Sequence, residues 1–403
     1  MYDVIVVGAR CAGAPTAMLL ARRGYRVLLV DRATFPSDTL SSHFIKPPGV
    51  ALLRQWGLLG HVVASGCPSV ARFRFDYGAV ALAGSPPPLD GVVESYAPRR
   101  TVLDSILVAA AARAGVEVRP AFTVEEVLAD GGQVIGIRGH TRGGVTATER
   151  ARLVVGADGR HSLVARAVAA PAYRAHAALT CAYYTYWSDV PLEEFEGYYP
   201  ERRVILVFPT NDGQVCTTVE WPHAEFGAVR TDVEGQFWAT VAQVPRLAER
   251  LRAGRRAARV AGTGDLANFF RTPYGPGWAL VGDAGYHKDP LTAQGISDAF
   301  RDAQLLAEAI DAGLSCRQPI VEALADYHRR RDEAAMAMYE LTCQRAALDM
   351  PPVPQMSQLL AGLRGNQTDT DRFIGVILGT VPIPDFFAPT NLERIMSAAS
   401  TSA

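Results

Sequence analysis

The residues of this chain whose types and spacing could do chemistry are the glycines and aspartates of three short motifs. The motifs are Gly8-Ala9-Arg10-Cys11-Ala12-Gly13, Gly156-Ala157-Asp158-Gly159, and Gly282-Asp283-Ala284 followed by Pro290, Gln294 and Gly295. Glycine lets a backbone come close to a phosphate, and an aspartate can accept hydrogen bonds from sugar hydroxyls. Together the motifs predict separated loops that enclose one nucleotide-containing cofactor.

The first motif lies between two expected strands, over residues 2–7 and 26–30, with a helix over about 12–23 between them. Such a unit offers a diphosphate the free N–H groups of the helix start. Asp31 ends the second strand, where it can bind ribose hydroxyls and repel a 2′-phosphate. The pattern therefore predicts a dinucleotide other than NADP, although Arg10 occupies a position where glycine is usual.

The third motif selects the cofactor. A strand over 278–282 runs into Asp283, and a long helix begins near Ala293. A carboxylate at this strand end suits the ribityl chain of a flavin, and a helix N-terminus stabilises negative charge on the reduced ring. Nicotinamide cofactors have no ribityl chain, so the motif favours FAD.

The motifs resemble those of the single-component class A FAD-dependent monooxygenases, which have the p-hydroxybenzoate hydroxylase fold. This family belongs to the wider superfamily of aromatic hydroxylases, halogenases and geranylgeranyl reductases. Its C-terminal signature is matched by Gly282, Asp283, Ala284, Pro290, Gln294, Gly295, Asp302 and Ala303, while Gly285-Tyr286, Ala293 and Ser297 depart from it. The segment from Arg100 to Asp104 also resembles a family motif, and Arg100 is expected to meet FAD phosphate oxygens.

The motifs and the resemblance together assign FAD binding to a set of residues along the whole chain. The set is Gly8, Cys11, Ala12, Gly13, Asp31, Arg32, Arg100, Asp158, Gly159, Gly282, Asp283, Pro290, Gln294, Gly295 and Ile296.

The expected fold is α/β: an FAD-binding Rossmann-like domain of the glutathione-reductase type, an inserted antiparallel β-sheet substrate domain, and a helical C-terminal region. We expect the FAD domain over 1–70, 99–171 and 276–345, and the substrate domain over 71–98 and 172–275. Residues 346–403 form the C-terminal segment. Within the substrate domain we expect a strand over 72–77, a Gly/Pro-rich turn over 84–88 and a return strand over 92–96 that pairs with the first. We also expect a hairpin turn at Asn211-Asp212-Gly213.

Candidate catalytic residues lie in segments expected near the flavin. Only two of the forty basic residues are lysines, and Lys46 could act as a compact donor with an adjustable pKa, or simply lie on the surface or pair with a phosphate. His43 is a candidate acid or base, and Pro290 is expected to border the flavin ring. Aromatic residues of the sheet domain either fill its core or line a cavity for a planar substrate, and the candidates are Tyr184, Tyr186, Phe208 and Trp221.

The resemblance implies a reaction in which NAD(P)H reduces FAD and O2 then forms a flavin C4a-hydroperoxide that oxygenates a small organic substrate. An aromatic or polycyclic compound of specialised metabolism is expected, and the choice of NADH or NADPH stays open. The alternatives are a halogenase, for which Lys46 would carry the halogen although the Trp-x-Trp-x-Ile-Pro motif is absent, and a geranylgeranyl-reductase-like double-bond reductase. FAD could also serve as a structural or sensory group.

Charge, hydropathy and cysteine content argue against several other classes of protein. The formal net charge is −1, with both signs interspersed, so no nucleic-acid partner is expected. No apolar stretch is long enough to suggest a membrane span, and the expected setting is cytoplasmic. The six cysteines include no Cys-x-x-Cys pair, so no metal site is expected. The expected partners are a small-molecule substrate and O2, in a monomer or homodimer.

Overall fold

A parallel sheet forms the centre of the first lobe in this computed structural model, which describes residues 1–348 and 354–400. The strand order along the sheet is β19 (Tyr274–Gly275), β20 (Trp278–Leu280), β10 (Thr146–Gly156), β1 (Tyr2–Val7), β2 (Val27–Val30) and β7 (Glu117–Arg119). Strands β20, β10, β1, β2 and β7 run parallel. β1 and β2 are almost fully buried apolar runs, as expected of strands covered on both faces.

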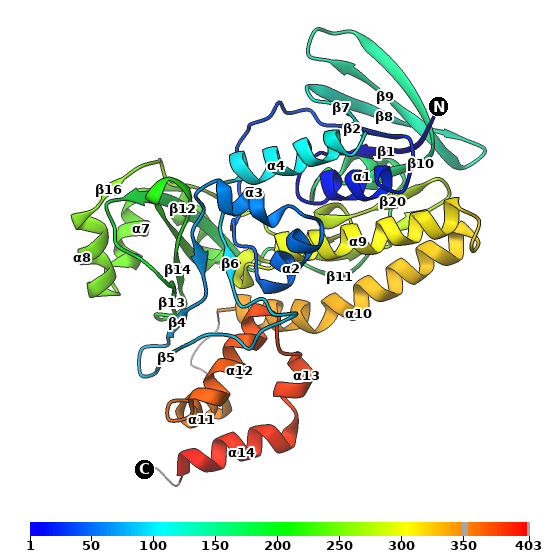
Figure 1. Cartoon of the computed structure of the whole chain (residues 1–403). Helices are drawn as coiled ribbons and strands as arrows, with labels where there is room; N and C mark the ends of the chain where they lie inside the picture. Colours follow the sequence, from blue (N-terminus) through cyan, green and yellow to red (C-terminus); the bar gives the residue numbers. More distant parts are fainter. Residues whose placement is uncertain (349–353, 401–403) are drawn as a thin grey trace.

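Helices cover one face of this sheet, and an antiparallel meander covers part of the other (Figure 1). The helices are α1 (Gly13–Ala21), α4 (Arg100–Arg113) and α9 (Gly295–Leu314). The meander joins β8 (Phe122–Asp130) and β9 (Gln133–Thr141) to the long strand β10. Almost every side chain of α1 is buried, because the helix lies between the sheet and neighbouring helices.

A second sheet forms the other lobe. Its order is β16 (Arg255–Arg256), β12 (Thr180–Ser188), β15 (Val215–Pro222), β14 (Val204–Pro209), β13 (Phe195–Tyr198), β4 (Phe73–Asp76) and β5 (Ala81–Gly84), with β17 (Ala261–Thr263) beside β12. All pairs are antiparallel except β13 with β4. The turn Asn211–Gly213 joins β14 to β15 as expected, with positive φ at Asp212 and Gly213.

The two faces of the second sheet differ in what they contact. Ile205, Val207 and Trp221 pack with helices α6 (Phe226–Thr231), α7 (Val233–Val241) and α8 (Pro245–Ala253). Leu206 and Phe208 point to the opposite face, because successive side chains of a strand alternate. That second face contacts Phe44 and the segment that contains Leu291, so it meets the first lobe.

The remaining elements join the two lobes. Small sheets pair β3 (Ser69–Val70) with β6 (Ser95–Tyr96), and β11 (Ala172–His176) with β18 (Asn268–Arg271) and β21 (Tyr286–His287). The other helices of this part are α2 (Pro47–Gln55), α3 (Leu59–Ala64), α5 (Leu163–Ala167) and the long α10 (Ile320–Ala346).

The C-terminal segment is helical in its described part. It consists of α11 (Pro354–Leu363), α12 (Gln367–Leu378), α13 (Ile383–Phe386) and α14 (Pro389–Ser400), which lie below the second sheet in Figure 1. Leu82 of β5 packs into the apolar core of these helices. Within the described residues, no helix combines the length and the apolar character needed to cross a bilayer.

The expected α/β fold, with its sheet domain and helical C-terminal region, is confirmed. One local prediction is wrong. The strand over 72–77 does not pair with 92–96, because a tight turn with positive φ at Gly78 leads directly into β5. Residues 95–96 pair instead with β3.

Candidate cofactor and substrate site

The three glycine motifs meet at one edge of the parallel sheet. Val7 at the end of β1 is in register with Gly156 at the end of β10, and Gly156 is in register with Leu280 at the end of β20. Because parallel strands present their carboxyl ends on the same side, the loops that follow them lie together. The sheet therefore brings residues from three distant parts of the chain to one place.

Glycine is required where these loops touch. Gly8 has φ +102, and a Cβ there would lie 2.3 Å from the carbonyl oxygen of Ala157. Gly282 has φ +60, and its Cβ would lie 2.6 Å from the Cβ of Ala12. The first motif thus contacts both the second and the third, and no larger residue fits at either contact.

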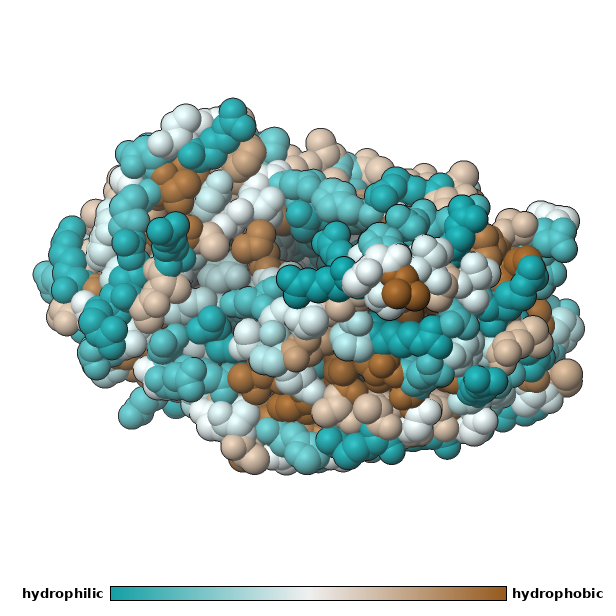
Figure 2. All heavy atoms as spheres, turned by 90° about the horizontal axis from the view of Figure 1, so that it is seen from above, coloured by the Kyte–Doolittle hydropathy of each residue, from teal (hydrophilic) through white to brown (hydrophobic). Residues whose placement is uncertain are grey.

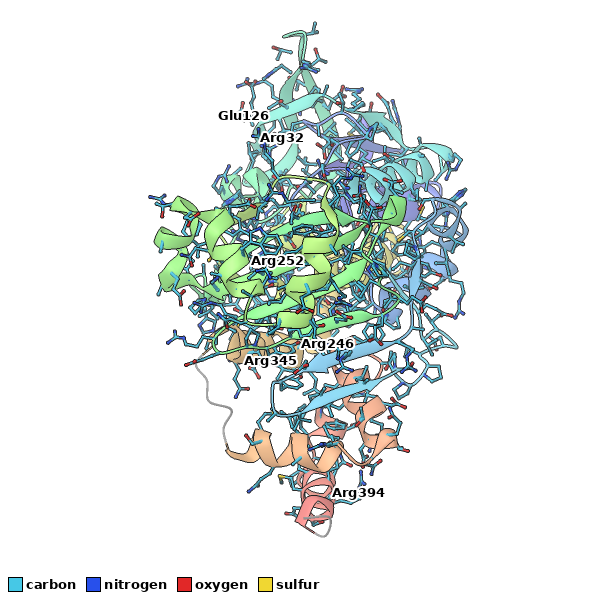
Figure 3. The ribbon with its side chains drawn as sticks, turned by 90° about the vertical axis from the view of Figure 1, so that its left-hand side faces the viewer. Arg32, Glu126, Arg246, Arg252, Arg345 and Arg394 are labelled. Carbon is cyan, nitrogen blue, oxygen red and sulfur yellow. The ribbon has the colours of Figure 1, made fainter. Side chains whose placement is uncertain are left out.

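Asp31 shapes the first loop. Its carboxylate accepts hydrogen bonds from the N–H groups of Ala9 and Ala33, each at 2.8 Å. The N–H groups of Cys11 and Ala12, at the start of α1, donate to no acceptor within the described residues. They are therefore available to a phosphate. The neighbouring Arg32 is exposed, near Glu126 of β8 (Figure 3).

Arg10 occupies a position where glycine is usual, and the structure shows how the larger residue fits: its side chain points into the protein. Its Nη1 lies 2.5 Å from the carboxylate of Asp104 in α4. Arg100 binds the same carboxylate through Nε and Nη2, and the Cys11 thiol donates to it at 3.6 Å. Burial raises the pKa of Cys11 to about 12. The buried Asp104 thus ties the glycine loop to α4 and holds Arg100 beside that loop.

Asp158 has a structural partner for each of its carboxylate oxygens. Ser162 Oγ donates to Oδ1 at 2.5 Å, and the Leu163 N–H donates to Oδ2 at 2.6 Å. The carboxylate therefore holds the start of α5. Gly159 follows with φ +79, a conformation that glycine adopts without strain.

The third motif is open to the surface at two points. Asp283 and Gly295 are exposed, although their neighbours Gly282, Gln294 and Ile296 are buried. The side chain of Asp283 has no hydrogen-bond or ion-pair partner among the described residues, and a Cβ on Gly295 would meet open space. From above, the molecular surface is hollowed where the two lobes meet (Figure 2). A free carboxylate and a helix N-terminus thus face accessible space, as a bound FAD requires.

Hydrogen bonds fix the conformation of the loop between Asp283 and Gly295. Asp289 caps the 3-10 turn Pro290–Thr292 through the Leu291 N–H, and it accepts from Thr180 Oγ1 at 2.7 Å. Ala293 then adopts φ +48. Glycine is usual at this position of the resembled signature, and the positive φ gives the physical reason. Pro290 is half-buried at the start of the turn.

His43 lies at the junction of the lobes. It is fully buried with φ +57, and its Nε2 lies 2.6 Å from the hydroxyl of Tyr186. Its Nδ1 is buried without a partner among the described residues. Burial and the nearby Arg100 lower the pKa of His43 to about 3, so the imidazole is neutral at pH 7.

Lys46 is also buried, with 2% of its surface exposed. Its Nζ donates to the carbonyl oxygen of Ile377 in α12, and the Gln294 side chain donates to the same oxygen at 3.3 Å. Burial, with the charges of Lys288 and Arg345, lowers the pKa of Lys46 well below its usual range. Lys288, by contrast, forms an ion pair with Asp298.

The four aromatic candidates separate into two groups. Tyr184 and Tyr186 are on the face that meets the first lobe, and both rings contact His43. Phe208 is on the same face and stacks on Phe195. Trp221 is on the other face, where its Nε1 donates to Thr240 of α7. The side-chain alternation of β15 thus turns Trp221 away from the first lobe, and we do not retain it as a substrate contact.

A narrow cavity lies between the second sheet, the 290–293 loop and α12. Its free volume is about 20 Å³. Its lining residues are Phe44, Lys46, Phe75, Phe195, Tyr199, Leu206, Leu291, Thr292, Ala293, Arg345, Ile377 and Leu378. The cavity is therefore aromatic and apolar, with two cationic side chains.

Sequence reasoning missed two features of this region. Arg345, at the end of α10, lines the cavity, yet nothing in its local sequence distinguishes it from other arginines. Glu220 of β15 is buried, and its Oε2 has no partner among the described residues. Burial, together with the charge of Asp289, raises the pKa of Glu220 well above its usual range. The available signal was a glutamate in a strand that carries no other charged residue.

Comparison with known proteins identifies the family. The family model described as an FAD binding domain matches residues 1–342. The chain belongs to this FAD-binding family. Its resemblance to the hydroxylase, halogenase and reductase superfamily is confirmed, and the protein is an FAD-dependent oxidoreductase.

Proteins with similar sequences are named for different reactions. Digeranylgeranylglycerophospholipid reductase 1 of Methanopyrus kandleri is 27% identical over 380 residues, which cover 89% of this chain and 93% of the reductase. The 6-methylpretetramide 4-monooxygenase of Streptomyces rimosus is 27% identical over 355 residues, covering 83% and 81% of the two chains.

Solved structures of similar fold include the myxobacterial chondrochloren halogenase CndH, with a TM-score of 0.80, 21% identity and coverage of 99% of this chain and 97% of that one. The probable FAD-dependent monooxygenase PqsL from Pseudomonas aeruginosa has a TM-score of 0.71 and 22% identity, with 93% and 99% coverage. These likenesses extend the fold match beyond the family region but leave the reaction open.

Proposed function

We propose that this protein is an NAD(P)H-dependent flavin monooxygenase that oxygenates a small aromatic or polycyclic compound. The observation that carries the proposal is the aromatic cavity next to the loop of the third motif. Leu291, Thr292 and Ala293 of that loop form one wall, and phenylalanines of the second sheet face them. An enclosed apolar space beside a flavin suits a reaction that must exclude water.

In this proposal FAD, when bound, supplies a two-electron carrier that is reduced by nicotinamide and reacts with O2. The residues of the chain bind, orient and shield. The start of α1 and the guanidinium of Arg100 hold the diphosphate, and Asp283 holds the ribityl chain. Pro290 and the N–H groups at Gln294 and Gly295 border the ring system, where a helix N-terminus favours negative charge.

His43 and Lys46 are the polar groups that we propose to act next to the substrate. His43 is neutral and has a buried, unpartnered Nδ1, so it can form a hydrogen bond to a bound ring without a charge. Tyr186 fixes the orientation of the imidazole through Nε2. Lys46 can donate to an oxygen on the substrate once it leaves the carbonyl of Ile377.

The direct test is to measure NAD(P)H oxidation and O2 uptake by the FAD-loaded protein against a panel of aromatic compounds. A substrate that stimulates both, and whose product gains one oxygen atom from isotopically labelled O2, supports the proposal. Substrate turnover that proceeds equally well without O2 contradicts it.

A double-bond reductase is the second candidate. Several relatives of similar identity are digeranylgeranylglycerophospholipid reductases, including the one from Methanopyrus kandleri. Such an enzyme would reduce an isoprenoid chain without O2, and anaerobic incubation with product mass analysis distinguishes the two reactions. Halogenation would instead require a halide, and Lys46 would be the residue to carry the halogen; halide-dependent product mass tests it.

A further inference from the structure

The cavity is lined by two basic side chains, Lys46 and Arg345, that have no carboxylate partner among the described residues. Buried cations elsewhere in the described structure have carboxylate partners: Arg100 binds Asp104, Lys288 binds Asp298, and Arg331 binds Asp332. This is the normal condition, because an unpaired buried charge is costly. Lys46, which is buried, and Arg345, which is half-buried, form no ion pair with any carboxylate among the described residues.

The partners that these two cations do have are weak or neutral. Lys46 donates to the carbonyl of Ile377, which lies in the last turn of α12. Arg345 lies 5.2 Å from the ring centroid of Tyr199, at the end of α10 beside the second sheet (Figure 3), and its guanidinium also interacts with the hydroxyls of Tyr77 and Tyr199. Tyr199 is itself neutral, because burial raises its pKa. The charge of Arg345 also disfavours the charged form of Lys46 and so contributes to the lowered pKa of Lys46.

We propose that the cavity binds an aromatic carboxylate, with the ring among the phenylalanine side chains and the carboxylate between Lys46 and Arg345. This inference rests on the proposed function for the identity of the site. A carboxylate placed there would favour the charged form of Lys46 and give Arg345 a negatively charged partner. The planar fork of a guanidinium matches a carboxylate, which favours this anion over others.

In this structure the carbonyl oxygen of Ile377 accepts the hydrogen bond from Lys46 that we propose for the ligand carboxylate. The free volume of the cavity, about 20 Å³, is too small for an aromatic ring, so a ring can enter only when α12 or nearby side chains move outward. Binding then exchanges a carbonyl acceptor for a charged one at Lys46, and a charge-assisted hydrogen bond is stronger.

The test is a titration of the FAD-loaded full-length protein with matched acids and amides, followed by calorimetry and by the visible spectrum of the flavin. Benzoate and benzamide form the first pair, and 2-naphthoate and 2-naphthamide form a larger pair. We expect each acid to bind at least about 10-fold more tightly than its amide. The pair comparison holds shape nearly constant and changes only the charge.

Three variants locate the effect. Arg345→Gln and Lys46→Met should each reduce the preference for acid over amide to within about 3-fold. Arg246→Gln removes an exposed arginine of α8 outside the cavity and should leave the preference unchanged (Figure 3). Circular dichroism and retained flavin show that each variant is folded.

Equal binding of acid and amide by the unaltered protein would overturn the inference. So would an absence of saturable binding of both acids, or a preference that survives in both cavity variants. The titration uses neither NAD(P)H nor O2. If the protein prefers acids but consumes no O2, the proposed monooxygenase function is wrong and the carboxylate site is supported. If the protein consumes O2 with a substrate but does not prefer acids, the carboxylate site is wrong and the proposed function is supported.

Discussion

The Nζ of Lys46 donates a hydrogen bond to the carbonyl oxygen of Ile377, although 331 positions separate the two residues in the sequence. Lys46 belongs to the FAD-binding region, whereas Ile377 lies beyond the 342 residues that the family model matches. The contact therefore joins the region that the family model matches to the C-terminal helices at the wall of the cavity.

Lys46→Met should alter how stability depends on pH. The folded protein lowers the pKa of Lys46, so the unfolded state binds the proton more tightly and stability rises with pH below the usual lysine value of about 10.4. Methionine removes this contribution. The unfolding free energy of the unaltered protein should thus increase relative to the variant between about pH 7 and 10. Parallel denaturant titrations at several pH values measure it, and a constant difference would contradict it.

Glu220→Gln should have the opposite pH dependence. Burial raises the pKa of Glu220, so the folded state holds the proton more tightly, and stability is lost as pH rises above about 4.3 towards the folded value. Glutamine keeps the shape without titrating. The variant should therefore gain stability relative to the unaltered protein as the pH rises from about 4 to 8. Thermal unfolding across that range tests the sign, and a relative loss would show that Glu220 is charged in the folded state.

Asp283→Ala should weaken FAD binding without weakening the fold. The carboxylate is exposed and makes no contact that holds other described residues. Loss of hydrogen bonds to the ribityl chain should lower the affinity for FAD by about 10- to 100-fold. Asp104→Asn is the matched contrast, because it leaves Arg10 and Arg100 without their buried partner and should cost about 3–5 kcal/mol of stability. Flavin titration and denaturant unfolding separate the two effects.

Ala293→Gly should stabilise the protein by up to about 1 kcal/mol, because alanine is strained at φ +48 and glycine is not. Ala109→Gly, in the middle of α4, should instead cost about 0.5–1 kcal/mol. Opposite signs in the same unfolding assay are the expected result. Destabilisation by both substitutions would mean that the Ala293 methyl contributes more by packing than its backbone conformation costs.

The fold around the cofactor could be predicted from the sequence, because the ends of strands and the glycines that follow them are recognisable from short stretches of sequence. Val7, Gly156 and Leu280 each end an apolar strand, and parallel pairing alone brings the following loops together. The positive φ at Gly8 and Gly282 likewise follows from residue type.

The substrate side was harder to predict, because it depends on contacts between distant segments. Trp221 was expected to contact the substrate but points to the other face of the sheet. Because β15 is buried on both faces, its sequence shows no alternation from which the orientation of Trp221 could be predicted. The hairpin after Phe73 was misjudged because a Pro-rich stretch gave a stronger turn signal than Gly78. Nothing in the local sequence of Ile377 shows that it meets Lys46.

The cavity borrows part of its wall from residues beyond position 342, namely Arg345, Ile377 and Leu378. A change confined to the C-terminal helices therefore alters the wall of the cavity and leaves the three glycine motifs untouched. Replacing these helices with those of a relative would show how far they set the choice of ligand independently of flavin binding.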